Sequence, residues 1–202
     1  MAKVAFVTEE GKPARAVINV ESVGLTPEQF FRLCCDNEAR IELTAQKELI
    51  IMSPTNRETA RQNAEITRQL TNWAKSDGTG VACDSNALYT LPNGAKRSPD
   101  GSWTRKSRWN AIKPDPRDHF DLLCPDFVLE LCSPNDRLQT VKAKMLEYIA
   151  NGAQLGFLVY PRKHQVWIYR PNQEPQQLDN PIVVSGDPEL PRFALDLTEI
   201  WQ

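Results

Sequence analysis

The sequence lacks the features of several large protein classes. Its 24 Lys and Arg against 26 Asp and Glu give a net charge of −2. Without a basic excess, any surface that binds nucleic acid would have to be local. No apolar run approaches membrane-spanning length, and the N-terminus has no uninterrupted apolar core of the signal-peptide kind. We therefore expect a cytoplasmic protein with no membrane partner.

Cysteine and histidine are too few and too scattered for a zinc site. The five cysteines include no C-x-x-C pair, and only His119 and His164 could join them. Buried free thiols in a reducing compartment are expected instead. No Ser/His/Asp or Cys/His arrangement calls for a covalent mechanism.

The length of 202 residues, without repeats or low-complexity tracts, predicts a single domain over residues 1–202. Strands outnumber helices, and a strand–helix–strand unit over 126–160 implies a parallel pair in a mixed sheet. The fold class is therefore α/β (α+β). Helices are expected after an N-cap at Thr26, over 57–76 and 105–112, from Asn135 or Asp136 to Gly152, and briefly at the C-terminus. Strands are expected at 15–20, 39–44, 47–54, 80–85, 87–92, 100–104, 126–132, 153–161, 164–171 and within 190–202.

Glu130 stands in the middle of an apolar strand, "CPDFVLELCSP". Alternation places Val128, Glu130 and Cys132 on one face of that strand, and both faces are largely apolar. A carboxylate there must be paired, protonated or bound to a cation, because a bare buried charge costs several kcal/mol. Glu130 is either half of a structural salt bridge or a metal ligand or general base.

Asp100 lies in "RSPDGSW", where Pro-Asp-Gly by itself is typical of a turn. A second carboxylate that follows about thirty residues later on a buried strand changes this interpretation, since two carboxylates can converge on one hard cation. In the helix after that strand, Lys142 and Lys144 lie at the two edges of the apolar stripe, and periodicity does not choose between them.

These segments, with "KMLEYIANGAQLGFLVYP", resemble the proposed endonuclease family called Uma-two, in the PD-(D/E)XK superfamily. The resemblance covers most of the chain and is most specific over 125–160. It implies a restriction-endonuclease-like mixed central sheet flanked by helices. It also implies an endonuclease that hydrolyses DNA with Mg²⁺, or with Mn²⁺ in its place.

The resemblance assigns a role to each candidate residue. Asp100 and Glu130 become the metal-binding catalytic acids, and Glu65 on the long helix becomes an accessory acid, although a solvated or paired glutamate is the commoner fate. Cys132 stands where the simple motif has lysine. The Lys-x-x-x-Tyr match then favours Lys144, from the next helix, as the catalytic lysine. Asp126, at the strand entry, is expected to bind backbone amides.

Basic residues surround Asp100 in the sequence, and Arg97, Arg105 and Lys106 are the candidates for contacts with DNA. Trp103 and Trp109 could stack on bases but are expected in the core. A homodimer is expected, because two sites related by a two-fold axis would cut both strands of a duplex. Two alternatives stay open: a catalytically inactive nuclease-like module that binds nucleic acid or protein, and a hydrolase of small phosphoesters.

Overall fold

The computed structural model describes residues 4–7, 15–37, 40–52, 54–113 and 118–202. They fall into two compact units, each made of discontinuous segments. The first comprises Met1–Thr55, Leu88–Ser98 and Ile112–Leu123, and the second comprises Asn56–Ala87, Pro99–Ala111 and Cys124–Gln202. Each unit is described by itself, and the single domain over 1–202 stays a prediction. No described helix is long and apolar enough to cross a membrane.

The first unit is built on an antiparallel sheet in the order β1-β2-β4-β3-β7-β6. β3 and β4, the strands expected at 39–44 and 47–54, form a hairpin closed by a turn in which the Lys47 N–H donates to the Thr44 carbonyl. β1 and β7 are not predicted by the sequence analysis. The strands are β1 (Val4–Val7), β2 (Arg15–Asn19), β3 (Arg40–Leu43), β4 (Glu48–Met52), β6 (Tyr89–Thr90) and β7 (Lys96–Arg97).

The helix of the first unit, α1 (Pro27–Cys35), begins as its sequence predicts. Thr26 accepts from the Gln29 N–H, and the Gln29 side chain accepts from the Thr26 N–H, so two otherwise unpaired amides are satisfied. Phe30 packs in a small core with residues of β3 and β4. A single 3₁₀ turn, η1 (Glu21–Val23), comes before α1.

The second unit holds the larger core and the mixed sheet, ordered β12-β11-β10-β9-β8-β5. Its one parallel pair is β9–β10, as the strand–helix–strand unit predicts, and the other pairs are antiparallel. β12 was not predicted. The strands are β5 (Gly80–Asp84), β8 (Gly101–Arg105), β9 (Phe127–Leu131), β10 (Leu155–Tyr160), β11 (Gln165–Tyr169) and β12 (Gln176–Asp179).

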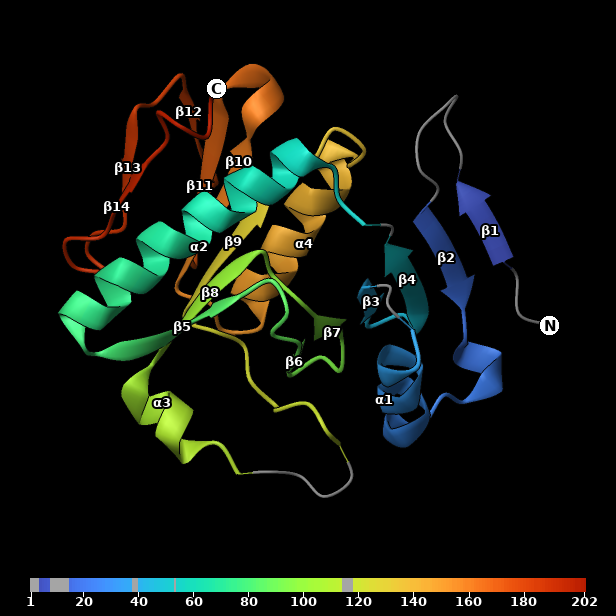
Figure 1. Cartoon of the computed structure of the whole chain (residues 1–202). Helices are drawn as coiled ribbons and strands as arrows, with labels where there is room; N and C mark the ends of the chain where they lie inside the picture. Colours follow the sequence, from blue (N-terminus) through green and yellow to red (C-terminus); the bar gives the residue numbers. More distant parts are fainter. Residues whose placement is uncertain (1–3, 8–14, 38–39, 53, 114–117) are drawn as a thin grey trace. The chain divides into compact units, whose positions relative to one another are not determined.

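Two long helices and one short helix accompany this sheet. α2 (Arg57–Asp77) runs across the strands in Figure 1 and ends at Gly78, which adopts a left-handed conformation. α3 (Lys106–Ala111) continues directly from β8. α4 (Leu138–Ala150) joins β9 to β10, with Arg137 as its N-cap. The expectation that Asn135 or Asp136 caps α4 is therefore wrong, because the chain turns once more and the Asp136 carboxylate binds the Ser133 N–H instead.

The alternation of β9 separates the two faces of the sheet. Phe127, Leu129 and Leu131 enter one core cluster with Ile66 and Leu70 of α2. On the opposite face, Val128 lies beside Gly156 of β10, where a β-carbon would stand 2.5 Å from the Met145 Cε of α4. Gly156 therefore lets α4 pack closely against the face that also carries Glu130.

The C-terminal segment closes the core of the second unit. β13 (Val183–Ser185) and β14 (Ala194–Asp196) form a separate antiparallel pair, and Phe193, Leu195 and Ile200 are buried. The tail strand was predicted. The short helix expected after it is a single turn, in which the Ile200 and Trp201 N–H groups donate to the Leu197 carbonyl.

Candidate active site

Glu130 lies at the second-last position of β9, on the face covered by α4, and is 6% exposed. Its Oε1 atom is 2.7 Å from the Lys144 Nζ. The same oxygen accepts a hydrogen bond of 3.0 Å from the Tyr148 hydroxyl. The cost of burying this carboxylate is thus offset by a cation and a hydrogen-bond donor.

Asp100 immediately precedes β8 and is 7% exposed. Its Oδ2 accepts a hydrogen bond of 2.8 Å from the backbone N–H of Leu131, the residue after Glu130. The antiparallel register pairs Gly101 with Leu129. One residue further along, the same register places Asp100 opposite Glu130. The structure therefore brings the two predicted acids to the same end of two neighbouring strands.

Lys144 and Tyr148 are one helical turn apart on α4, which aligns them on one face of the helix. The Lys144 side chain is 13% exposed, and its Nζ lies 5.8 Å from the centroid of the Tyr148 ring. Lys142 points elsewhere, with its Nζ 4.1 Å from the centroid of the Trp167 ring. Of the two lysines that periodicity could not separate, only Lys144 is paired with Glu130.

Tyr148 is a site residue for which the sequence analysis proposed no role. Its side chain is fully buried. The available signal was the Lys-x-x-x-Tyr spacing, because a residue four positions after a site lysine shares its side of the helix. The tyrosine body belongs to the core, while its hydroxyl belongs to the site.

Cys132 is buried two residues after Glu130. Burial, followed by the charges of Asp136 and Glu130, raises the pKa of its thiol to about 12. At neutral pH the side chain is therefore an uncharged thiol. It cannot supply the positive charge of the lysine that stands here in the simple motif.

The oxygen ligands at the strand ends suit a hard cation. Carboxylates from two adjacent strands match the way Mg²⁺ is held in proteins, by one or two carboxylates with several waters retained. Asp100 and Glu130 would be these ligands. Within the described ranges no group of three or more His, Cys, Asp or Glu side chains could hold a metal ion, so a third acid is not at hand.

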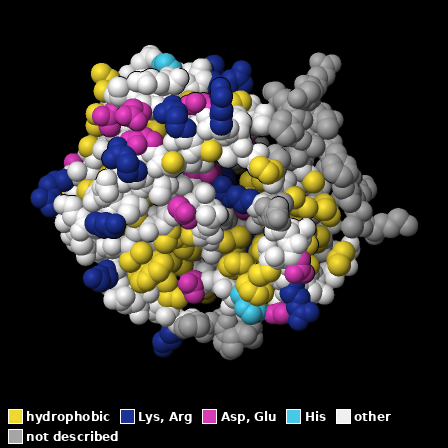
Figure 2. Space-filling model, viewed as in Figure 1, with side chains coloured by type: hydrophobic (Ala, Val, Ile, Leu, Met, Phe, Trp, Pro, Cys, Tyr) yellow, Lys and Arg dark blue, Asp and Glu magenta, His cyan; other side chains and the backbone are white. Residues whose placement is uncertain are grey.

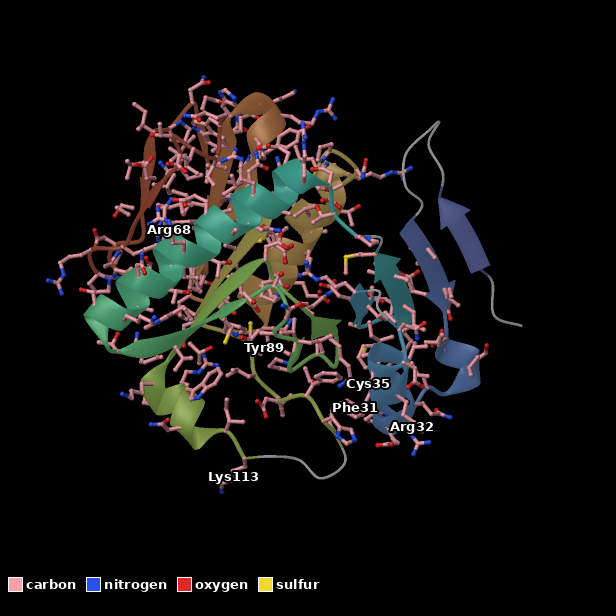
Figure 3. All side chains as sticks on the ribbon, in the orientation of Figure 1. Phe31, Arg32, Cys35, Arg68, Tyr89 and Lys113 are labelled. Atoms are coloured by element: carbon pink, nitrogen blue, oxygen red, sulfur yellow. The ribbon has the colours of Figure 1, made fainter. Side chains whose placement is uncertain are left out.

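Glu65 occupies α2 with its side chain 13% exposed. Both carboxylate oxygens bind Arg68, at 2.5 and 2.7 Å, and the Gln69 amide donates to Oε1. The hydrogen bonds from Arg68 lower the pKa of the Glu65 carboxyl. Figure 3 labels Arg68 on this helix. Glu65 thus has the local partners expected of a paired helix glutamate.

Arg105 and Lys106 lie at the opposite end of β8 from Asp100, about 16 Å away for five extended residues. Both side chains are exposed. The Arg105 N–H donates to Asp126, which also pairs with Arg108 at 2.8 Å. The expectation that Asp126 binds a backbone amide is confirmed. The structure does not bring Arg105 and Lys106 alongside the two acids.

Arg97 and its neighbour Lys96 belong to the first unit, where both are buried. Arg97 pairs with Glu42 at 3.1 Å, and Lys96 with Asp118 at 2.5 Å. Trp103 is buried in the second unit, as expected. On the face shown in Figure 2, the described Lys and Arg side chains alternate with acidic and apolar ones, so a basic surface for DNA would be local.

Two comparisons with known proteins find relatives. The model of a family described as "Uma2: Putative restriction endonuclease" matches residues 27–198. A solved structure from Anabaena variabilis ATCC 29413, titled a "putative nuclease belonging to DUF820", is similar with a TM-score of 0.71. It is 22% identical and covers 87% of this chain and 97% of its own. No curated protein matches the sequence. The similarity confirms the expected restriction-endonuclease-like fold.

Proposed function

The chain belongs to the Uma2 family, whose model covers residues 27–198, and from this premise we propose that it is a metal-dependent endonuclease that hydrolyses phosphodiester bonds in DNA. One observation supports the proposal above the others. Two buried carboxylates, Asp100 and Glu130, meet at adjacent strand ends, and a lysine from the next helix reaches one of them.

Asp100 and Glu130 would hold Mg²⁺ or Mn²⁺, with their positions set by contacts that the fold provides. The Leu131 N–H orients Asp100, while Lys144 and the Tyr148 hydroxyl orient Glu130. When bound, the metal would polarise the scissile phosphate and lower the pKa of a coordinated water.

Lys144 would act on the substrate rather than on the metal. Its ammonium group would stabilise charge that develops on the phosphate, or orient the attacking water. In-line attack of that water would break the bond from phosphorus to the leaving oxygen without a covalent enzyme intermediate. Glu65 would contribute only as an accessory acid, since Arg68 and Gln69 already bind it.

Arg105 and Lys106 would contact DNA phosphates away from the cleaved bond, as their distance from Asp100 requires. Arg97 would take part only if its buried pair with Glu42 opened. A homodimer would place two such sites on one duplex.

The test compares isosteric variants at the same sheet edge. Asp100→Asn and Glu130→Gln should each reduce cleavage of plasmid DNA in Mg²⁺ or Mn²⁺ to the uncatalysed background, with folding checked by circular dichroism. Asp136→Asn is the matched control. Its exposed side chain, on the β9–α4 connection, should still bind the Ser133 N–H, and its cleavage should equal that of the unmodified protein.

Metal binding measured by calorimetry separates this proposal from the alternatives. Cleavage that survives in both acid variants would contradict the site. No cleavage and no Mg²⁺ or Mn²⁺ binding by the unmodified protein would favour the inactive module. Metal-dependent hydrolysis of small phosphoesters, with DNA left intact, would favour the phosphoester hydrolase.

A further inference from the structure

The connection between β10 and β11 reaches the edge of the sheet that carries the two acids. β9 and β10 are parallel, with Leu131 opposite Val159, and the Cys132 N–H donates to the Val159 carbonyl at 2.8 Å. The carboxyl ends of both strands therefore lie at one edge. The 3₁₀ turn η2 (Pro161–Lys163) starts two residues after Val159, and Figure 1 shows it directly beyond β10.

Contacts of His164, the residue after this turn, hold the turn in place. The His164 N–H donates to the Pro161 carbonyl, and the His164 carbonyl accepts from the Asn180 N–H at 2.7 Å. The His164 ring stacks on Trp201, with centroids 5.2 Å apart. The backbone of η2 is thus anchored, and its side chains are presented from a defined position.

Arg162 and Lys163 are the two basic side chains of η2, and both are exposed. Neither has an ion pair or a hydrogen bond within the described part of the chain. Arg97 and Arg108, by contrast, are paired, with Glu42 and Asp126 respectively. Two unpaired cations at the same sheet edge as a pair of buried acids suit an anionic ligand that bridges the two groups.

We propose that Arg162 and Lys163 bind backbone phosphates of the DNA strand whose scissile phosphate lies at Asp100 and Glu130. The inference rests on the proposed function and adds a substrate-binding element to it. An Arg guanidinium can bind a phosphate through two parallel hydrogen bonds, and the Lys ammonium adds a point charge. Such contacts offset the repulsion between the phosphates and the acids and hold the strand in register with the site.

The experiment compares two pairs of variants that remove the same charge. Arg162→Gln with Lys163→Gln alters η2, while Lys75→Gln with Arg192→Gln removes two exposed basic side chains of the same unit, Lys75 in the last turn of α2 and Arg192 near β14. Binding of a fluorescent duplex is measured in EDTA between 50 and 200 mM salt. Cleavage is measured separately with Mg²⁺ and with Mn²⁺.

The η2 pair should bind the duplex more weakly and lose less affinity as salt is added. Loss of two phosphate contacts should shrink the fall in affinity over this salt range by about tenfold, from a slope of about 0.9 per phosphate. The control pair should match the unmodified protein. The inference is overturned if the η2 pair binds as tightly as the unmodified protein, if both pairs weaken equally, or if the unmodified protein does not bind the duplex.

Binding and cleavage fail independently, which keeps the two proposals apart. Weak binding by the η2 pair together with no cleavage by the unmodified protein in either metal would overturn the nuclease and leave the phosphate contact standing. Cleavage by the unmodified protein together with full binding by the η2 pair would overturn the phosphate contact and leave the proposed nuclease standing. Thermal melting of all variants shows whether the turn still folds.

Discussion

Glu42 in the first unit and Glu130 in the second are both buried glutamates, but their neighbouring groups differ. Glu42 is 2% exposed and binds with both oxygens, Oε2 to Arg97 and Oε1 to the Ser98 N–H. Glu130 is 6% exposed, and Lys144 and Tyr148 both reach its Oε1. Burial and a cationic partner are therefore common to both acids, and neither property by itself identifies a functional site.

The difference lies in the neighbouring groups. Glu42 of β3 binds Arg97 of the neighbouring strand β7 and the N–H of Ser98, the residue after that strand, so these contacts join β3 to β7. Glu130 has a second carboxylate opposite it, and its cation comes from a helix rather than from the sheet. A divalent metal could therefore take over part of the charge compensation that Lys144 provides for Glu130.

The largest expected effect is on the structural pair. Arg97→Met would leave the Glu42 charge buried without its cation, so the free energy of unfolding should fall by about 3–5 kcal/mol. Urea denaturation measures this loss, and Mg²⁺ should not restore it. The exposed pair Arg32–Glu28 is the control, since Arg32→Ala should cost less than about 1 kcal/mol. Equal losses in the two variants would remove the distinction between the buried and the exposed pair.

Lys144→Met should have the next largest effect, on catalysis. We expect cleavage about 10²-fold slower, because a positioned cation or proton donor is lost, while Mg²⁺ still binds at the two acids. Added Mg²⁺ should also raise the melting temperature of this variant, since a metal can take over the pairing of Glu130.

Lys142→Met is the matched control for Lys144→Met. It lies two residues away on the same helix, over Trp167, and should cleave like the unmodified protein. A slower rate for Lys142→Met than for Lys144→Met would reverse the assignment. If Mg²⁺ leaves the melting temperature of Lys144→Met unchanged, Glu130 does not bind the metal and is a structural acid like Glu42.

Tyr148→Phe should produce the smallest effect, about tenfold in cleavage rate or Mg²⁺ affinity, as for groups that orient metal ligands. The substitution removes the hydroxyl that donates to Glu130 and keeps the buried ring. Titration calorimetry and initial rates measure the two quantities. Tyr169→Phe is the control, because Tyr169 is also buried in this unit. A change of equal size at Tyr169 would show that Tyr148 acts only through packing.

Much of the fold was predictable because local patterns specify it. The capping box at Thr26, the extent of α2, the β3–β4 hairpin and the parallel β9–β10 pair all depend on residues close in sequence or on one periodicity. Errors occurred at the ends of elements. The N-cap of α4 and the turn after β14 depend on how a few polar groups are satisfied, and several arrangements compete there.

The nearness of basic residues to Asp100 in the sequence did not predict their nearness in space. β8 leads away from Asp100, so Arg105 lies at the far end of the strand, and Arg97 is withdrawn into a buried pair. Arg162, about thirty residues after Glu130 in the chain, comes to the sheet edge instead, because parallel strands end on the same side.

The sequence by itself determined which acids are costly to bury, because the alternation of a strand is a local property and an apolar strand leaves Glu130 little choice of environment. Only the tertiary structure decided which groups meet that acid. The ion pair of Lys144 with Glu130 and the hydrogen bond from the Tyr148 hydroxyl depend on the packing of α4 against β9 and β10, where Gly156 permits the close approach of the helix. Pairing energies depend on distances of a few ångströms, which strand register and helix packing set and periodicity alone does not.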